Sequence, residues 1–149
     1  MKNFILENND GTPFDLYQYQ GNENLLMIFF RGAWCNHCKK QLRGINNLSA
    51  YFEKLGMRIV AVSSDTKFKS SLLKNFLKLK FPVISDSNFE IIDSFDLRTR
   101  YKEAEVAKPA VFIFSPNHEI LFHYIGENYD DRLSGRAILL EAERLQRNG

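Results

Sequence analysis

Apolar residues follow two patterns along this chain, continuous runs and stripes that recur every three or four positions. Continuous runs are typical of strands buried on both faces of a sheet, whereas stripes with helical spacing indicate amphipathic helices. The runs predict strands at 25–30, 58–63, 81–85 and 109–114, and a strand at 120–125 is expected to return antiparallel. Residues 3–20 surround the turn signal Asn9-Asp10-Gly11, which predicts a short hairpin or an extended entry segment.

The stripes predict helices between and after these strands. The first helix is expected to begin at Cys35 and to continue to about Leu55, where Gly56 suits a left-handed C-terminal cap. The expected N-terminal caps are Ser64, Asp65 or Thr66 for the second helix, Ser87 or Asn88 for a small third helix, and Ser134 for the last. The residues expected to be buried are Leu42, Ile45, Leu48 and Phe52 in the first helix, Phe68, Leu72, Phe76 and Leu79 in the second, Phe89, Ile92 and Phe95 in the third, and Ile138, Ala142 and Leu145 in the last.

The order of these elements indicates an α/β fold in one domain that spans residues 1–149. The succession of strand, helix and strand over residues 25–63 predicts a parallel pair of strands joined by a right-handed crossover. Residues 96–108 are charged and show no clear period, so we expect them to form a mobile loop.

Composition narrows the classes of function. The chain has 149 residues, of which 44% are hydrophobic, enough for one globular domain with its own core. A formal charge of +2 does not favour binding to nucleic acid or to a membrane surface. We expect neither a signal peptide nor a membrane span, because no basic start precedes an apolar run and no run approaches about 20 residues. A cytoplasmic protein is therefore expected.

The candidate chemistry lies in Cys35 and Cys38, the only two cysteines of the chain. Three positions apart at a helix start, they share one face at a separation that suits a disulfide. Unpaired N–H groups and the helix dipole favour a thiolate there, and a thiolate is the nucleophilic form. We expect Cys35 at the exposed mouth of the helix and Cys38 one turn deeper. Nearby positive charge comes from Arg31, His37, Lys39 and Lys40.

A zinc site and an inert pair of core cysteines are the alternatives to a redox dithiol. A structural zinc ion needs four ligands, and the remaining candidates are His37, His118 and His123. His118 and His123 lie five positions apart on a turn and a strand, which places them on opposite faces. We therefore expect no metal ion, and no other cofactor, since no Gly-x-Gly-x-x-Gly segment follows a strand.

The motif resembles the active site of the thioredoxin fold, and Pro109 heads a strand where that superfamily keeps a cis-proline beside the dithiol. From about residue 4 to 147, the chain is similar to the peroxiredoxin-like redoxins of the alkyl hydroperoxide reductase/thiol-specific antioxidant (AhpC/TSA) group. The segments that carry the resemblance are 30–38, 61–65, 81–86, 109–113 and 130–132.

The resemblance implies a thioredoxin-like fold with a central mixed β-sheet flanked by helices. It implies an antioxidant enzyme that reduces peroxides while Cys35 and Cys38 form a disulfide, which a thioredoxin- or glutathione-type thiol reduces again. Such a protein would be a monomer or a homodimer. Trp34 would flank and shield the dithiol, and His37 would stabilise the thiolate, as in the Cys-Pro-His-Cys motif of bacterial disulfide-forming oxidants. The alternatives are a protein-disulfide oxidoreductase without peroxidase activity and a non-catalytic redox-sensing module.

The sequence departs from peroxiredoxins around the motif. If Phe29-Phe30-Arg31 is aligned with their Phe-Tyr-Pro, Cys38 takes the place of the peroxide-reacting cysteine; in the thioredoxin alignment, Cys35 attacks and Cys38 resolves. Arg31 stands near the position of the missing proline, and Pro109 occupies the position of a peroxiredoxin arginine. The order of attack therefore stays open, and Arg31 is expected to act either on the thiolate or on a structural carboxylate.

Overall fold

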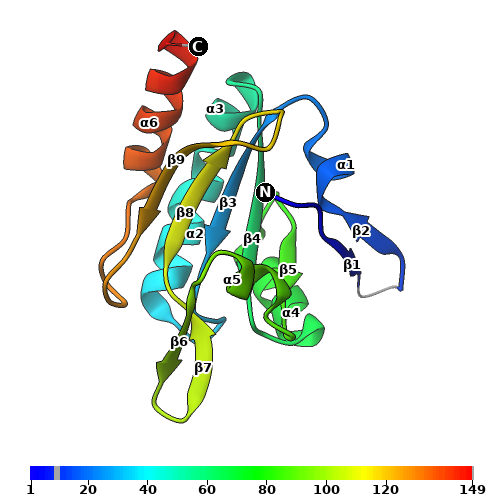
Figure 1. Ribbon diagram of the computed structural model, residues 1–149. Helices are drawn as coiled ribbons and strands as arrows, with labels where there is room; N and C mark the ends of the chain where they lie inside the picture. Colours follow the sequence, from blue (N-terminus) through cyan, green and yellow to red (C-terminus); the bar gives the residue numbers. More distant parts are fainter. Residues whose placement is uncertain (9–10, 149) are drawn as a thin grey trace.

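The computed structural model describes residues 1–8 and 11–148, so Asn9 and Asp10 of the expected turn lie outside the described residues. Its centre is a five-stranded sheet in the order β5–β4–β3–β8–β9 (Figure 1). β3, β4 and β5 are parallel, β8 is antiparallel to β3, and β9 is antiparallel to β8. The predicted α/β fold with a central mixed sheet is therefore confirmed. The strands are β3 (Asn24–Phe29), β4 (Met57–Ser63), β5 (Val83–Ser85), β8 (Ala110–Phe114) and β9 (Ile120–Ile125).

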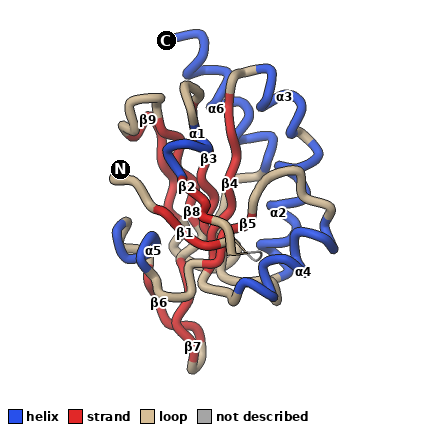
Figure 2. Tube along the Cα trace, turned by 90° about the vertical axis from the view of Figure 1, so that its right-hand side faces the viewer, coloured by secondary structure: helices blue, strands red, loops and turns tan. Residues whose placement is uncertain are grey.

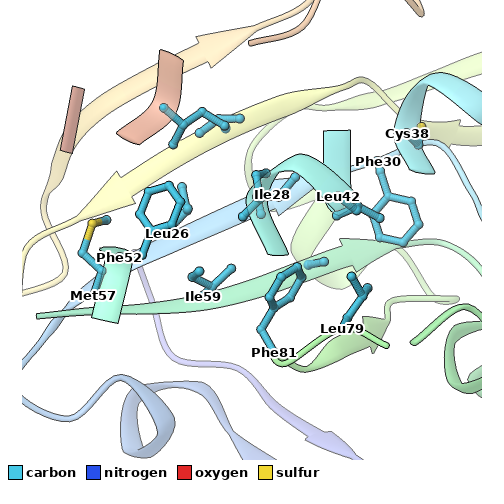
Figure 3. Packing of buried hydrophobic residues seen from close by; sticks show 14 of the residues in the cluster. Leu26, Ile28, Phe30, Cys38, Leu42, Phe52, Met57, Ile59, Leu79 and Phe81 are labelled. Atoms are coloured by element: carbon cyan, nitrogen blue, oxygen red, sulfur yellow. The ribbon is translucent and has the colours of Figure 1, made fainter. Parts of the chain in front are cut away.

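The two faces of the sheet bury separate apolar clusters, because successive side chains of a strand point to opposite faces. On β3, Leu26 and Ile28 join one cluster, whereas Leu25, Met27 and Phe29 join the other. The first cluster (Figure 3) packs under α2 (Asn36–Asn47), α3 (Ser49–Lys54), α4 (Lys67–Leu77) and α6 (Gly135–Asn148). The second packs under α1 (Leu16–Gln20), α5 (Glu90–Ser94) and the antiparallel pair β1 (Ile5–Glu7) and β2 (Pro13–Asp15). Figure 2 shows α5 and α2 on opposite sides of the strands.

The first expected helix is interrupted at Leu48, so the prediction of one continuous helix was wrong. Leu48 has φ −103° and ψ 9°, which separates α2 from α3. Its N–H donates to the carbonyl of Ile45 at 3.0 Å, three residues back. Because this tight turn redirects the chain, Ile45 and Phe52 both reach the first cluster from two short helices. Gly56, with φ +70°, ends the second segment in the left-handed conformation that we expected.

The buried face of α4 was also predicted wrongly. Phe68, Leu72 and Phe76 are 71%, 52% and 70% exposed, whereas Leu73 and Leu77 are buried in the first cluster. Both stripes have helical spacing, so periodicity alone did not distinguish them. The helix starts as expected at Thr66, whose side chain accepts a hydrogen bond from the Lys69 N–H at 3.2 Å.

Residues 96–108 contain a hairpin in place of the expected mobile loop. β6 (Arg98–Tyr101) pairs antiparallel with β7 (Ala104–Ala107), and the hairpin extends beyond the end of the central sheet (Figure 1). Arg98 links the hairpin to α5 through an ion pair with Asp93 at 2.6 Å, and it links β6 to β7 through an ion pair with Glu105 at 2.7 Å. A projecting two-stranded ribbon buries few side chains, so its sequence lacks the apolar alternation that would have indicated strands.

Of the predicted N-terminal caps for the last two helices, the one for α5 was wrong and the one for α6 was correct. Neither Ser87 nor Asn88 caps α5; instead, the buried carboxylate of Asp86 accepts hydrogen bonds from the N–H groups of Ile91 and Ile92 at 3.0 and 2.8 Å. Ser134 caps α6 as expected, since its Oγ accepts from the Ala137 N–H at 3.1 Å. Among the helices in the described ranges, none has the length and apolar character needed to cross a membrane.

Candidate active site

Cys35 and Cys38 lie together at the N-terminus of α2. Cys35 is the N-cap residue, and its Sγ accepts a hydrogen bond from the Cys38 N–H at 3.3 Å. Cys38 lies one turn deeper, beyond Phe30 and Leu42 at the margin of the first cluster (Figure 3), and its Sγ accepts from the Arg31 N–H at 3.4 Å. The predicted order along the helix is therefore correct. The expected exposure of Cys35 is wrong, because only 3% of this residue is accessible to solvent.

The two thiols have very different acidities. A hydrogen bond from the Cys38 thiol lowers the pKa of Cys35 to about 5, with further lowering from the Cys38 N–H and from the charges of Arg132 and Arg31, although burial opposes these effects. The same hydrogen bond, together with burial, raises the pKa of Cys38. These opposite shifts favour the thiolate at Cys35 and the thiol at Cys38, a distinction that the spacing of the motif did not provide.

Arg31 is the cation in contact with this thiolate. Its Nη1 lies 4.0 Å from Sγ of Cys35, and the residue is only 7% exposed. The guanidinium lies over the rings of Tyr101, Trp34 and Tyr129 at 4.1, 4.8 and 5.4 Å, contacts that favour a buried cation. Within the described ranges, Arg31 forms no ion pair with a carboxylate. Of its two expected roles, the geometry supports the one on the thiolate.

Trp34 and Tyr101 form the outer wall of the site. Their rings stack at 5.0 Å with an interplanar angle of 15°, and Trp34 is 47% exposed. Trp34 also packs directly on Gly32, where a Cβ would lie 2.3 Å from the indole Nε1. Trp34 therefore contacts Arg31, the arginine beside Cys35, and its expected shielding of the dithiol stays a prediction. Tyr101 was missed because its hairpin was predicted to be a loop.

Arg132 connects the segment before α6 to the active-site helix. Its Nε and Nη2 donate to the carbonyl of Tyr129 at 2.9 and 2.6 Å, and its Nη1 donates to Oε1 of Gln41 at 3.3 Å. Gln41 is buried and donates in turn to the carbonyl of Leu133 at 2.8 Å. The segment is thereby held against α2, with the Arg132 charge near both sulfurs. The sequence indicated Arg132 only through the family resemblance, and it gave no signal for Gln41 or Tyr129.

His37 lies on the outer side of α2. It is exposed, and its ring contacts that of Tyr129 at 5.1 Å. The groups that lower the pKa of Cys35 are Cys38, Arg132 and Arg31, so the expected stabilisation of the thiolate by His37 stays a prediction.

Pro109 lies at the start of β8, beside the loop that follows β9. No peptide bond is cis within residues 1–8 and 11–148, so the expected cis bond before Pro109 was wrong. The trans form is intrinsically favoured by about 0.5–1 kcal/mol. Here the backbone is held on both sides of the bond: the Lys108 N–H donates to Leu97 O, and the Gly126 N–H donates to Pro109 O, both at 2.8 Å.

The histidines considered for zinc lie in different surroundings. His118 stacks on Tyr17, and His123 stacks on Phe112. In the described part of the chain, no three His, Cys, Asp or Glu side chains converge in a way that suits a metal ion.

Comparison with known proteins places the chain among redox proteins. A family model described as AhpC/TSA family matches residues 1–123. The thiol-disulfide oxidoreductase ResA of Bacillus subtilis (strain 168) is 28% identical over 123 residues, which cover 80% of this chain but only 62% of that relative. Peroxidoxin BcpB from Mycobacterium tuberculosis has a TM-score of 0.84 at 19% identity, covering 99% of this chain and 94% of that chain. AhpC of Enterococcus faecalis has a TM-score of 0.83 at 18% identity, covering 98% and 89%. These structural matches confirm the thioredoxin-like fold.

Proposed function

The chain belongs to the AhpC/TSA family, and we propose that it is a thiol oxidoreductase that cycles between the reduced cysteines and a Cys35–Cys38 disulfide. The observation that carries this proposal is the pair of cysteines at the start of α2, where Sγ of Cys35 accepts a hydrogen bond from the Cys38 N–H at 3.3 Å and the pKa of Cys35 is lowered. A thiolate is the nucleophile towards both peroxides and disulfides. Cys35 therefore attacks and Cys38 resolves.

We propose a peroxide as the substrate, because the attacking sulfur is almost buried. With Cys35 only 3% exposed, a small molecule reaches Sγ more readily than a protein disulfide does. The thiolate attacks one peroxide oxygen, the O–O bond breaks, and Cys35 becomes a sulfenic acid. The other oxygen leaves as hydroxide or alkoxide and takes up a proton. Arg31, next to the sulfur, stabilises the negative charge that develops on this oxygen.

The second half of the cycle uses Cys38. Its sulfur attacks the Cys35 sulfenic acid, water leaves, and the disulfide forms without a large backbone movement, because the residues are one turn apart. Two equivalents of an external thiol, of thioredoxin or glutathione type, then reduce the disulfide by exchange.

Thiol–disulfide exchange is the second candidate function. It is favoured by the similarity to proteins named thiol-disulfide oxidoreductase ResA, although the chain spans less than two thirds of the length of the Bacillus subtilis protein. A disulfide substrate must approach Cys35 in line with its S–S bond. Because Cys35 is only 3% exposed, this approach requires neighbouring side chains to move.

Rapid mixing with hydrogen peroxide tests the proposal. We expect the wild type to react much faster than a free thiol and to lose two hydrogen atoms in intact mass. Cys38→Ser should accumulate a dimedone-reactive sulfenic acid at Cys35, whereas Cys35→Ser should react slowly. If the wild type reacts no faster than a free thiol but reduces insulin, the protein is a disulfide oxidoreductase. If only Cys35→Ser forms the sulfenic acid, Cys38 is the attacking residue.

A further inference from the structure

A groove of about 670 Å³ lies between α2 and the segment that leads into α6. Its size falls within the range of about 300–1,000 Å³ that is usual for small-molecule sites. One carboxylate, that of Asp130, lines it. The positively charged or protonatable side chains that line it are His37, Lys40 and Arg43 on α2, Arg132 in the connecting segment, and Arg136 on α6.

The positive charge of this groove is not neutralised by the protein itself. Within the described ranges, the ion pairs involve none of the groove lysine and arginine side chains. Neither α2 nor α6 carries an acidic residue in its first turn. The whole chain has a formal charge of only +2, so this excess of cations is local. A concave, unpaired cluster of one sign of charge attracts ligands of the opposite sign.

The walls of the groove are held in place independently of a ligand. Gln41 and Arg132 link α2 to the 129–133 segment through the hydrogen bonds described above. The backbones of Gly44 and Gly135 are in close contact, since a Cβ on Gly135 would lie 2.7 Å from the carbonyl carbon of Gly44. The backbone that carries the cationic side chains is therefore held in place before a ligand binds, which reduces the entropy lost on binding.

We propose that this groove binds a small molecule that carries two or more negatively charged groups, carboxylates or phosphates, and that Arg132 couples its occupancy to the dithiol. Arginine provides the planar donor fork that both kinds of group accept. The binding itself stands apart from the redox cycle, whereas the effect on reactivity rests on the proposed function, in which Cys35 is the attacking thiolate.

The coupling follows from the charges around Cys35. Cys38 and Arg31 contact this sulfur, and the charge of Arg132, which is held against α2 by Gln41, also lowers the pKa of Cys35. An anion bound at Arg132 offsets part of its positive charge, so the thiolate loses stabilisation and alkylation at mildly acidic pH becomes slower. Coupling is reciprocal. The anion should therefore bind more tightly to the disulfide form, which lacks the negative charge on Cys35, than to the reduced form.

Calorimetry on the full chain tests the inference, with pyrophosphate and citrate as probes at constant ionic strength. We expect one saturable site, tighter in the oxidised protein, and the stronger of the two probes indicates whether phosphate or carboxylate is preferred. The double variant Lys40→Gln/Arg136→Gln should weaken binding by about tenfold or more, which corresponds to about 1.4 kcal/mol. The matched control Lys54→Gln/Arg147→Gln makes the same change of charge outside the groove and should bind like the wild type.

Three results would overturn the proposal. The first is that neither pyrophosphate nor citrate shows saturable binding. The second is that both double variants bind the probes equally more weakly than the wild type. The third is that only hexaglutamate binds, which would indicate an acidic protein partner. Peroxide and insulin assays on the same samples separate this proposal from the redox one. Saturable binding in a protein without redox activity leaves the site intact, and redox activity without saturable binding rejects only the site.

Discussion

The guanidinium of Arg31 lies 4.0 Å from Sγ of Cys35, and only 7% of this arginine is accessible to solvent. The buried guanidinium is thus stabilised by the Cys35 sulfur and by the aromatic rings around it. In this chain, the positive charge beside Cys35 comes from the turn before the motif. The relationship leads directly to a first prediction.

Arg31→Gln should raise the pKa of Cys35, because the thiolate loses a nearby positive charge. Below a pKa of about 5, each unit by which the pKa rises lowers the thiolate fraction about tenfold, so we expect the alkylation of Cys35 by iodoacetamide at pH 4 to slow by up to about tenfold. The rate measured between pH 4 and 9 gives the pKa directly. Arg58→Gln removes an equally charged but exposed side chain and serves as the control. An unchanged profile in Arg31→Gln would show that the contact does not stabilise the thiolate.

The thiolate also makes the stability of the reduced protein depend on pH. The hydrogen bond from Cys38 and the nearby charges lower the pKa of Cys35 to about 5 in the folded state, whereas an unfolded cysteine titrates near about 8.5. Between these values, the unfolded chain holds a proton that the folded chain lacks. The contribution of Cys35 is therefore fully present above the unfolded pKa and is lost as the pH falls through about 5.

Cys38 affects stability in the opposite direction. Because its pKa is raised in the folded state, its contribution to the free energy of unfolding is fully present below the pKa of an unfolded cysteine and is lost at higher pH. Comparing the wild type with Cys35→Ser isolates the contribution of Cys35 to the free energy of unfolding. We expect the free energy of unfolding of the reduced wild type, minus that of Cys35→Ser, to increase from pH 5 to pH 8 in urea titrations. A difference that decreases over this range would contradict a thiolate at Cys35.

Tyr101→Ala should open the outer wall of the site, because Trp34 loses the ring on which it stacks. Reaction of Cys35 with the bulky disulfide DTNB should accelerate several-fold relative to its reaction with iodoacetamide. The ratio of the two rates measures access and cancels changes in acidity. Tyr51→Ala removes an exposed tyrosine on α3 and should leave the ratio unchanged. If the ratio is also unchanged in Tyr101→Ala, the hairpin does not limit access.

Neighbouring leucines of α4 should differ sharply in their contribution to stability. Leu73 is 4% exposed, whereas Leu72 is 52% exposed. Leu73→Ala should lower the free energy of unfolding by about 2–4 kcal/mol, because it leaves a cavity in the first cluster. Leu72→Ala should change it by less than about 0.5 kcal/mol. Urea denaturation of both variants checks the orientation of the helix, and equal losses would show that α4 is rotated from the described position.

The glycines between α2 and α6 provide a second matched pair. A Cβ on Gly135 would lie 2.7 Å from backbone carbon of Gly44, whereas a Cβ on Gly44 would lie 3.7 Å from Gly135 N. Gly135→Ala should therefore force the helices apart and destabilise the fold by about 1–3 kcal/mol. Gly44→Ala removes a flexible residue from a helix interior and should stabilise by about 0.5–1 kcal/mol. Thermal unfolding of both variants distinguishes close packing from helix propensity.

Much of the fold was predictable because it depends on local periodicity. The apolar run at 25–30 and the stripe that follows Cys38 predicted a buried strand and an active-site helix, and the family resemblance added the central mixed sheet. The choice between the two apolar stripes of α4 was not predictable, since both repeat with helical spacing and only the position of the sheet distinguishes them. The β6–β7 hairpin was missed because a projecting ribbon does not bury an alternating face.

The sequence by itself determined that two cysteines share one face at a helix start, because their spacing and the helical period are local properties. Only the tertiary structure shows the contacts that lower the pKa of Cys35 and raise that of Cys38. Tyr101 and Tyr129 come from segments far along the chain, and Arg132 acts on both sulfurs from the segment before α6. The electrostatic stabilisation of a thiolate depends on the distance to nearby charges and on burial. Both are set by how distant segments pack together, and the order of residues along the chain does not show this.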